Sequence, residues 1–144
     1  MKYEPFWKYD GYTYECFNYG GKNLRHQAEE RAKNGNDWTE AELLDLYTEL
    51  VKMLKALYDA SSIHRRINPK ALVFGENSKM MLTNFDALRK DAEINKTISR
   101  TTAMTEDTQF LAPEYQTEDN PTYKYKVDVY AMGMVMMYMA TAVE

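Results

Sequence analysis

The sequence contains a single cysteine, Cys16, and few of the aliphatic side chains that usually fill a core. One cysteine cannot form a disulfide within the chain, which excludes a disulfide-rich secreted domain and indicates a reducing compartment. Leu, Ile, Val and Phe together account for only 26 of the 144 residues. So low a content permits disorder, but the net charge of −4 is too small to favour it. Twelve Tyr and ten Met supply apolar mass instead, and both types are also common at interfaces.

The sequence also lacks an excess of basic charge, and we expect no secretory leader. The chain has 18 Lys and Arg against 22 Asp and Glu, so we expect no nucleic acid partner. The first ten residues lack the apolar stretch of a secretory signal. We therefore expect an intracellular, cytoplasmic protein, and association with the cytoskeleton or an organelle stays open. A length of 144 residues suits one domain and is short for two.

The first 60 residues predict one strand and two helices. Alternating aromatic and polar residues over 12–16 are typical of a strand. Residues 22–33 predict a short surface helix. Apolar residues recur every three or four positions through 40–60, which predicts a long amphipathic helix. Thr39 is its expected N-cap, and Glu42 would complete a capping box.

The rest of the chain predicts a hairpin, a loop and a further helix. The short apolar runs 71–74 and 80–82 flank a polar turn, as in a β-hairpin. Residues 84–111 are polar and loop-like, whereas 127–143 are almost wholly apolar and predict a buried helix. The elements do not repeat as βαβ units, so we predict an α+β fold that is mainly α-helical.

Segments in this order resemble motifs of the C-terminal lobe of eukaryotic protein kinases. Residues 63–73 (IHRRINPKALV) resemble the catalytic loop, which the family writes H-R-D-L-K-P-E-N. Residues 82–86 (LTNFD) stand where D-F-G would stand, and residues 112–114 match A-P-E. Residues 127–133 (VDVYAMG) resemble the start of the family's buried central helix. Upstream, residues 14–21 resemble the hinge strand that joins the two lobes.

The resemblance implies a partial kinase C-lobe with a hinge strand, two helices, a small hairpin, an activation-segment-like loop and a buried apolar helix. Residues 1–21 are then a hinge-strand-like N-terminal segment, and residues 22–144 form one C-lobe unit. The family's glycine-rich loop and its lysine-bearing strand have no counterpart in the sequence. We therefore expect a truncated domain whose nucleotide cleft lacks one wall.

The positions that carry chemistry in the family hold other residues here. Phosphoryl transfer depends mostly on positioning and charge neutralisation. Arg66 replaces the Asp that accepts the substrate proton, and a guanidinium cannot act as a base. Asn68 replaces the family's Lys, and Ala71 replaces its metal-binding Asn. Asn84 and Asp86 replace the Asp and the Gly of D-F-G. These changes predict that catalysis has been lost.

The residues that have packing roles in the family are kept. His64 and Phe85 match positions that stack behind the family's active site. Asp128 matches the residue that accepts backbone hydrogen bonds from the catalytic loop. The degenerate catalytic-loop positions are His64, Arg65, Arg66, Asn68 and Ala71, the degenerate metal-binding positions are Asn84, Phe85 and Asp86, and the structural motif comprises Ala112, Pro113, Glu114 and Asp128.

The histidine and the two arginines have alternative interpretations. No Cys, Asp or second His stands at ligand spacing from His64, so a structural histidine is favoured over a metal ligand. In the family, the catalytic-loop Arg often pairs with a phosphorylated activation loop. Arg65 and Arg66 suit that role, and residues 97–108 contain several Thr. A solvated Thr-rich loop without a phosphate is the favoured interpretation.

A bound metal ion is not expected. Asn84, Asp86 and Glu114 leave at most a weak cation site once Ala71 replaces the second ligand. The Met cluster at 132–139 offers thioethers to Cu(I), but no His or Cys stands nearby. Adaptable packing is the favoured role of these Met residues. We therefore expect neither a metal ion nor a cofactor.

The apolar residues 129–143 favour a helix buried in protein over a membrane anchor. Fifteen helical residues reach about 22 Å, which is short of the roughly 30 Å of a bilayer core. A helix that is apolar on all sides must be covered. In the family, later helices cover it. We therefore predict a protein partner over its Met-rich face, which consists of Met132, Met134, Met136, Met137 and Met139.

The preferred functional prediction is a catalytically inactive kinase-like protein that acts as a structural or interaction subunit of a larger assembly, and not as an enzyme. One alternative is a residual nucleotide-binding or phosphotransferase module that another chain completes. A second alternative is an adaptor regulated by phosphorylation. A third is a non-functional fragment of a kinase.

Overall fold

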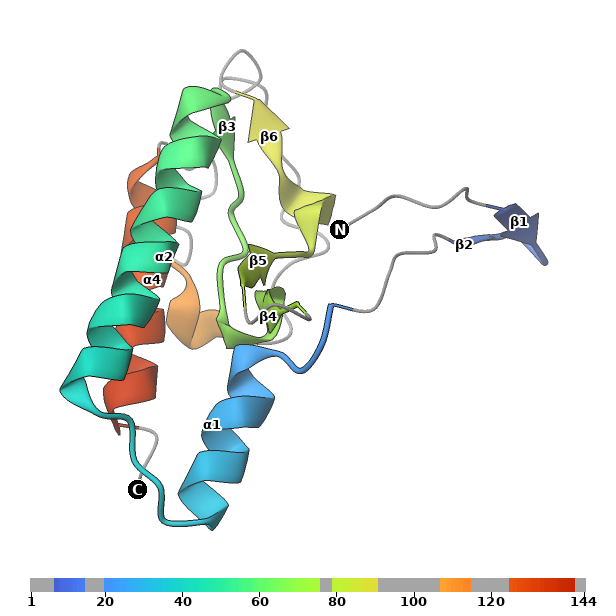
Figure 1. Ribbon diagram of the computed structural model, residues 1–144. Helices are drawn as coiled ribbons and strands as arrows, with labels where there is room; N and C mark the ends of the chain where they lie inside the picture. Colours follow the sequence, from blue (N-terminus) through green and yellow to red (C-terminus); the bar gives the residue numbers. More distant parts are fainter. Residues whose placement is uncertain (1–6, 15–19, 76–78, 91–106, 115–124, 142–144) are drawn as a thin grey trace.

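The computed structural model describes residues 7–14, 20–75, 79–90, 107–114 and 125–141. Within these ranges, three α-helices pack beside small two-stranded antiparallel sheets (Figure 1). The predicted α+β class, mainly helical and consistent with part of a kinase C-lobe, is therefore confirmed.

An aromatic hairpin comes first. Strand β1 (Trp7–Tyr9) pairs with β2 (Tyr12–Tyr14), and the turn residues Asp10 and Gly11 both have positive φ. Two-residue turns of this kind match the twist of the strands that they join. Figure 1 shows this hairpin apart from the helices. The predicted strand is thus present over 12–14, whereas Cys16 lies outside the described residues.

Helix α1 (Leu24–Lys33) agrees with the predicted surface helix. Asn23 caps it, because its side-chain Oδ1 accepts a hydrogen bond from the backbone N of His26 at 2.8 Å. Leu24 and Ala28, one turn apart, are buried and attach the helix to the core.

Helix α2 (Glu40–Asp59) begins with the predicted capping box. The backbone N of Glu42 donates to Thr39 Oγ1 at 3.3 Å, and the backbone N of Thr39 donates to Glu42 Oε2 at 2.9 Å. This reciprocal pair satisfies two N–H groups that a helix start leaves without partners. Leu46 and Leu50 are buried and form the inner side of the helix.

Two short sheets and three 3₁₀ helices follow α2. The predicted hairpin is confirmed as β4 (Leu72–Phe74) paired with β5 (Met80–Leu82). Strand β3 (Ser62–Ile63) pairs with β6 (Arg89–Lys90), which the sequence did not predict. The 3₁₀ helices, also not predicted, are Pro69–Ala71, Phe85–Ala87 and Thr108–Phe110.

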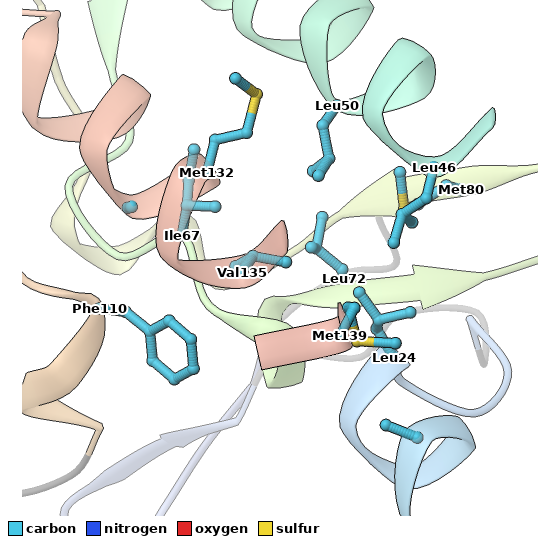
Figure 2. Packing of buried hydrophobic residues seen from close by; sticks show 12 residues of the cluster. Leu24, Leu46, Leu50, Ile67, Leu72, Met80, Phe110, Met132, Val135 and Met139 are labelled. Atoms are coloured by element: carbon cyan, nitrogen blue, oxygen red, sulfur yellow. The ribbon is translucent and has the colours of Figure 1, made fainter. Parts of the chain in front are cut away.

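Helix α4 (Lys126–Thr141) lies beside α2 and supplies much of the core (Figure 1). Figure 2 shows Met132, Val135 and Met139 of this helix among side chains from α1, α2 and β4. Val135 and Met139 have no exposed surface, and Met132 is 8% exposed. Within the described ranges, no helix combines the length and hydropathy that a bilayer crossing requires.

Candidate active site

A buried carboxylate, that of Asp128, holds the loop that follows β3. Asp128 Oδ2 accepts a hydrogen bond from the backbone N of His64, and Oδ1 accepts one from the backbone N of Arg65, both at 2.7 Å. Arg65 has a φ of 71°, a left-handed conformation that is costly for a residue with a side chain. The two charge-assisted bonds offset that cost and fix the loop against α4.

Burial shifts the pKa values of both Asp128 and His64. Burial raises the pKa of the Asp128 carboxyl, and the hydrogen bonds from His64 and Arg65 oppose that shift. Burial also lowers the pKa of His64. His64 Nε2 lies 2.9 Å from the carbonyl oxygen of Thr83, so this nitrogen carries the proton. Its Nδ1 accepts from the backbone N of Arg66 at 3.3 Å, which fits a neutral ring.

The two site segments meet through Thr83 and Phe85. Both the backbone N and Oγ1 of Thr83 donate to the carbonyl oxygen of Ala71, at 2.8 and 3.0 Å. The ring of Phe85 stands edge-on to His64 with centroids 5.1 Å apart. Asn84, between them, has a left-handed φ of 63°, which Asn tolerates better than most residues. The resemblance therefore pairs the right segments, although Phe85 remains half exposed.

Asn68 shapes the loop and caps a short helix. Its Oδ1 accepts from the backbone N of Lys70 at 2.9 Å and of Ala71 at 3.1 Å. Its Nδ2 donates to the carbonyl oxygen of Arg66 at 3.2 Å. Asn68 thus has a local structural role, and Ala71 is completely buried.

Arg66 forms an ion pair with Asp86 across the two segments. The Asp86 side chain is 58% exposed, whereas that of Arg66 is 24% exposed. Exposed ion pairs contribute little to stability and open easily. The pair therefore leaves the exposed Asp86 carboxylate open to exchange for a ligand that offers a better partner.

A second charged cluster was missed by the sequence analysis. Asp107 accepts from Arg25 at 3.0 Å and contacts Lys70 Nζ at 3.1 Å, and its side chain is only 14% exposed. Arg25 lies on α1, and Lys70 lies on the catalytic-loop-like segment. No sequence pattern indicates this cluster, because Arg25 and Asp107 are 82 positions apart.

The carboxylates of the described site differ in availability. The buried Asp128 carboxylate accepts hydrogen bonds from two backbone N–H groups. The Asp107 carboxylate forms ion pairs with Arg25 and Lys70. Asp86 has the largest exposed fraction of the three. Among the described residues there is no group of three or more His, Cys, Asp or Glu that would hold a metal ion. Asp86 is therefore the carboxylate best placed to meet a phosphate-bound cation.

The remaining predicted residues, Ala112, Pro113 and Glu114, lie in the segment that follows the 3₁₀ helix Thr108–Phe110. Ala112 is buried in a small cluster with Ile63 and Val127, and Glu114 is partly exposed. Pro113 is exposed but has contacts of its own. Phosphorylation of the Thr-rich loop was the less favoured interpretation. Of its Thr residues, Thr108 lies in the described part of the chain, and Thr97, Thr101, Thr102 and Thr105 lie outside it.

The predicted Met interface is divided between core and surface. Met132 and Met139 are buried in the chain's own core. Met134 and Met136 are partly buried against that core, and Met137 is 53% exposed. Met132 and Met139 therefore do not present surface to a partner.

The family model for the protein kinase domain matches residues 2–144 of this chain. Serine/threonine-protein kinase B of Synechocystis is 28% identical over 122 residues, covering 81% of this chain and 21% of that protein. The probable serine/threonine-protein kinase PknB of Corynebacterium glutamicum is 26% identical over 121 residues, 84% of this chain and 18% of that protein. Receptor-like kinase TMK4 of Arabidopsis thaliana is 35% identical over 91 residues, 63% of this chain and 9% of that protein. The chain thus spans about a fifth of the first two relatives.

These comparisons correct two expectations. The prediction of a catalytically inactive structural or interaction subunit is contradicted, because the relatives are named as serine/threonine protein kinases and the family model is that of the kinase domain. The prediction that the chain is not an enzyme is wrong for the same reason. The replacements at Arg66, Asn68, Ala71, Asn84 and Asp86 change the site, but they do not by themselves demonstrate inactivity.

Proposed function

Because this chain belongs to the protein kinase domain family, we propose that its catalytic-loop-like and D-F-G-like segments form a site that transfers phosphate from ATP to serine or threonine hydroxyls of a protein. The observation that carries this proposal is the hydrogen bonding of Asp128 to the backbone of His64 and Arg65. It supports a loop held in a set geometry, which phosphoryl transfer requires above all.

Charge neutralisation is the chemistry that the site can supply. In the transfer, the bond between the γ-phosphorus and the bridging oxygen of ATP breaks, ADP leaves, and the hydroxyl oxygen bonds to the phosphorus. Arg66 cannot accept the hydroxyl proton, so in this proposal the proton passes to the transferred phosphate and from there to water. The transferred group carries negative charge on three oxygens, and the protein makes few covalent changes itself. Arg66 and Lys70 provide two cations on the loop, each now bound to a carboxylate. Phosphate oxygens are strong acceptors for such cations. In this proposal the two side chains exchange Asp86 and Asp107 for the nucleotide's phosphates.

The proposal includes Mg²⁺ bound with the nucleotide. Mg²⁺ commonly uses one or two protein carboxylates and completes its shell with waters and phosphates. Asp86, whose exposed side chain pairs with Arg66, fits that requirement, and the side-chain oxygen of Asn84 is a further candidate. Mg²⁺ would supply neutralisation of phosphate charge. Release from Arg66 would make the Asp86 carboxylate available to Mg²⁺.

The direct test is phosphate transfer by the purified 144-residue chain. It is incubated with Mg²⁺, γ-labelled ATP and a protein rich in Ser and Thr, and incorporated label is counted. We expect incorporation by the wild type and at least tenfold less by Asp86→Asn. Asp59→Asn, a matched change at an exposed carboxylate near the end of α2, should leave incorporation unchanged. Absence of label, together with no rise in melting temperature with Mg²⁺ and ATP, would refute the proposal.

The proposal also includes a protein partner on the outer side of α2 and α4. A groove of about 330 Å³ lies there, and its lining is mainly apolar: Val51, Leu54, Tyr58, Tyr125 and Val129 contribute to it. Tyr58 and Val129 are exposed. Apolar surface gathered in one groove supports coverage by protein. The single cysteine supports a reducing, intracellular setting for both parts of the proposal.

A photo-crosslinking residue placed at Tyr58 tests this partner. In cells, we expect a discrete crosslinked product from position 58. Position 47 is the matched control, because Tyr47 is another exposed tyrosine of α2 that does not line the groove. Equal amounts of crosslinked product from positions 58 and 47 would contradict a partner that binds specifically in the groove.

A further inference from the structure

A second pocket lies away from the candidate active site, where α2 meets the β4–β5 hairpin. We call it the hairpin pocket. It has a volume of about 300 Å³ and an apolar floor of Trp38, Leu46, Phe74 and Met80. Leu46 and Met80 are buried and hold the floor to the core. A pocket of this size can take one or two apolar side chains.

The rim of the hairpin pocket is mainly acidic. Glu42, Asp45 and Glu49 line it, and Lys79 is the cation among the lining residues that the structure gives. The spacing of three and four residues places the three carboxylates on one face of α2. From Glu40 to Glu49 the helix has four carboxylates and no basic residue. The pocket therefore favours a ligand with positive charge next to an apolar group.

The three carboxylates are not equally available. Glu42 is held by Arg31 and by Thr39, and these contacts lower its pKa to about 2. Glu49 pairs with Lys52 at 2.6 Å on the surface, where such pairs are weak. Asp45 is exposed, and no ion pair of Asp45 is found in the described part of the chain. Asp45 and Glu49 are thus the groups open to an incoming cation.

Trp38 contributes aromatic surface to the floor of this pocket. The guanidinium carbon of Arg31 lies 4.0 Å from the centre of the ring and holds it in place. The indole Nε1 is buried and has no hydrogen-bond partner within the described residues, so the ring offers a ligand apolar contact and not a hydrogen bond.

We propose that the hairpin pocket binds a peptide segment of a protein partner, with an apolar side chain in the pocket and adjacent Arg or Lys side chains on Asp45 and Glu49. The acidic face from 42 to 49 is about 10 Å long, at 1.5 Å per helical residue. That length matches about three residues of an extended peptide at roughly 3.3 Å each. This inference does not rest on phosphate transfer.

Three labelled pentapeptides test the chemistry of the ligand by fluorescence anisotropy with the 144-residue chain at low salt. The first is Arg-Arg-Gly-Leu-Gly, the second replaces both arginines by glutamates, and the third replaces the leucine by glycine. We expect the first to bind at least tenfold more tightly than either of the others. Equal binding of the first two would exclude the acidic rim as the recognition element, and equal binding of the first and third would exclude the apolar floor.

Variants of the chain test the location. Asp45→Lys combined with Glu49→Lys should weaken the first peptide at least tenfold. Asp59→Lys is the matched control, because Asp59 is an exposed, lysine-paired carboxylate of the same helix outside the pocket, and its effect should stay within twofold. Unchanged binding by the double variant would overturn the proposal.

Discussion

The buried and the exposed parts of the candidate active site are built differently. In the buried part, Asp128 and His64 bind backbone groups: two N–H groups and the carbonyl of Thr83. In the exposed part, Arg66 and Asp86 bind each other through their side chains. Contacts to the backbone do not depend on which side chains follow in the loop. The loop can therefore keep its shape while its charged positions differ from the family's pattern.

This difference explains why the replacements alone misled the functional prediction. The exposed charged residues, such as Arg66 and Asp86, decide which chemistry is available. The buried residues Asp128 and His64 decide whether the two segments meet at all. Both segments do meet here, through Thr83 and Ala71. Substitutions in one part of the site at a time should therefore differ in their effect on the unfolding free energy.

The largest effect is expected from Asp128→Ala. Loss of the carboxylate leaves two buried N–H groups without partners, which costs about 4 kcal/mol of unfolding free energy at roughly 2 kcal/mol each. Asp86→Ala, in the exposed part, should cost less than about 1 kcal/mol. Urea unfolding followed by circular dichroism measures both.

Asp128→Asn keeps an acceptor and provides a milder test if Asp128→Ala does not fold. It should fall between the other two variants in unfolding free energy. Equal losses of unfolding free energy in Asp128→Asn and Asp86→Ala would contradict a larger contribution of the buried contacts to stability.

Two Met residues of α4 give the next largest contrast. Met139 has no exposed surface, whereas Met137 is 53% exposed. Met139→Ala should cost about 3 kcal/mol through lost burial and a residual cavity. Met137→Ala should change the unfolding free energy by less than about 0.5 kcal/mol. Similar losses in the two variants would contradict the core seen in Figure 2.

The pH dependence of stability tests the buried histidine. Because burial lowers the pKa of His64 below its ordinary 6.5, the unfolded chain binds this proton more readily than the folded chain. His64 thus contributes full stability above about pH 6.5, and stability is lost as the pH falls below that value. The slope is at most about 1.4 kcal/mol per pH unit.

Urea unfolding at pH 7.5 and 5.5 measures this loss. His64→Gln should reduce the difference between the two values, since its amide can still donate to Thr83 without titrating. His26→Gln changes an exposed histidine and should keep the difference. The account would be contradicted if His26→Gln removed the difference in unfolding free energy between the two pH values while His64→Gln kept it.

A smaller effect than that of Asp128→Ala is expected where the same kind of contact is exposed. Thr39 accepts a backbone hydrogen bond at the start of α2, much as Asp128 does in the core. Thr39→Ala should cost about 1 kcal/mol. Thr48→Ala, in the middle of the same helix, removes only a bond to the carbonyl of Leu44 and should cost less. A larger loss for Thr48→Ala in thermal unfolding would contradict the capping box.

Features set by neighbours in sequence were predicted well. The capping box of α2 depends on Thr39 and Glu42, three positions apart, and the β4–β5 hairpin depends on two runs and the turn between them. The meeting of the catalytic-loop and D-F-G-like segments was available from the family resemblance, because motif order implies it.

Features set by distant residues were not predicted. Asp107 binds Arg25 and Lys70 in a fold where Leu24 of α1 and Phe110 of the 3₁₀ helix Thr108–Phe110 belong to the same buried core. The apolar residues of α4 continue around the helix, so the sequence could not separate buried Met139 from exposed Met137. The short β3–β6 pair likewise joins segments too short to show a period.

Amide hydrogen exchange at His64 and Arg65 tests the central claim most directly. If Asp128 holds both N–H groups in a buried frame, they exchange only when the whole protein unfolds, and their exchange free energies equal the global unfolding free energy. Exchange of these two amides at the rate of exposed loop amides would contradict the account.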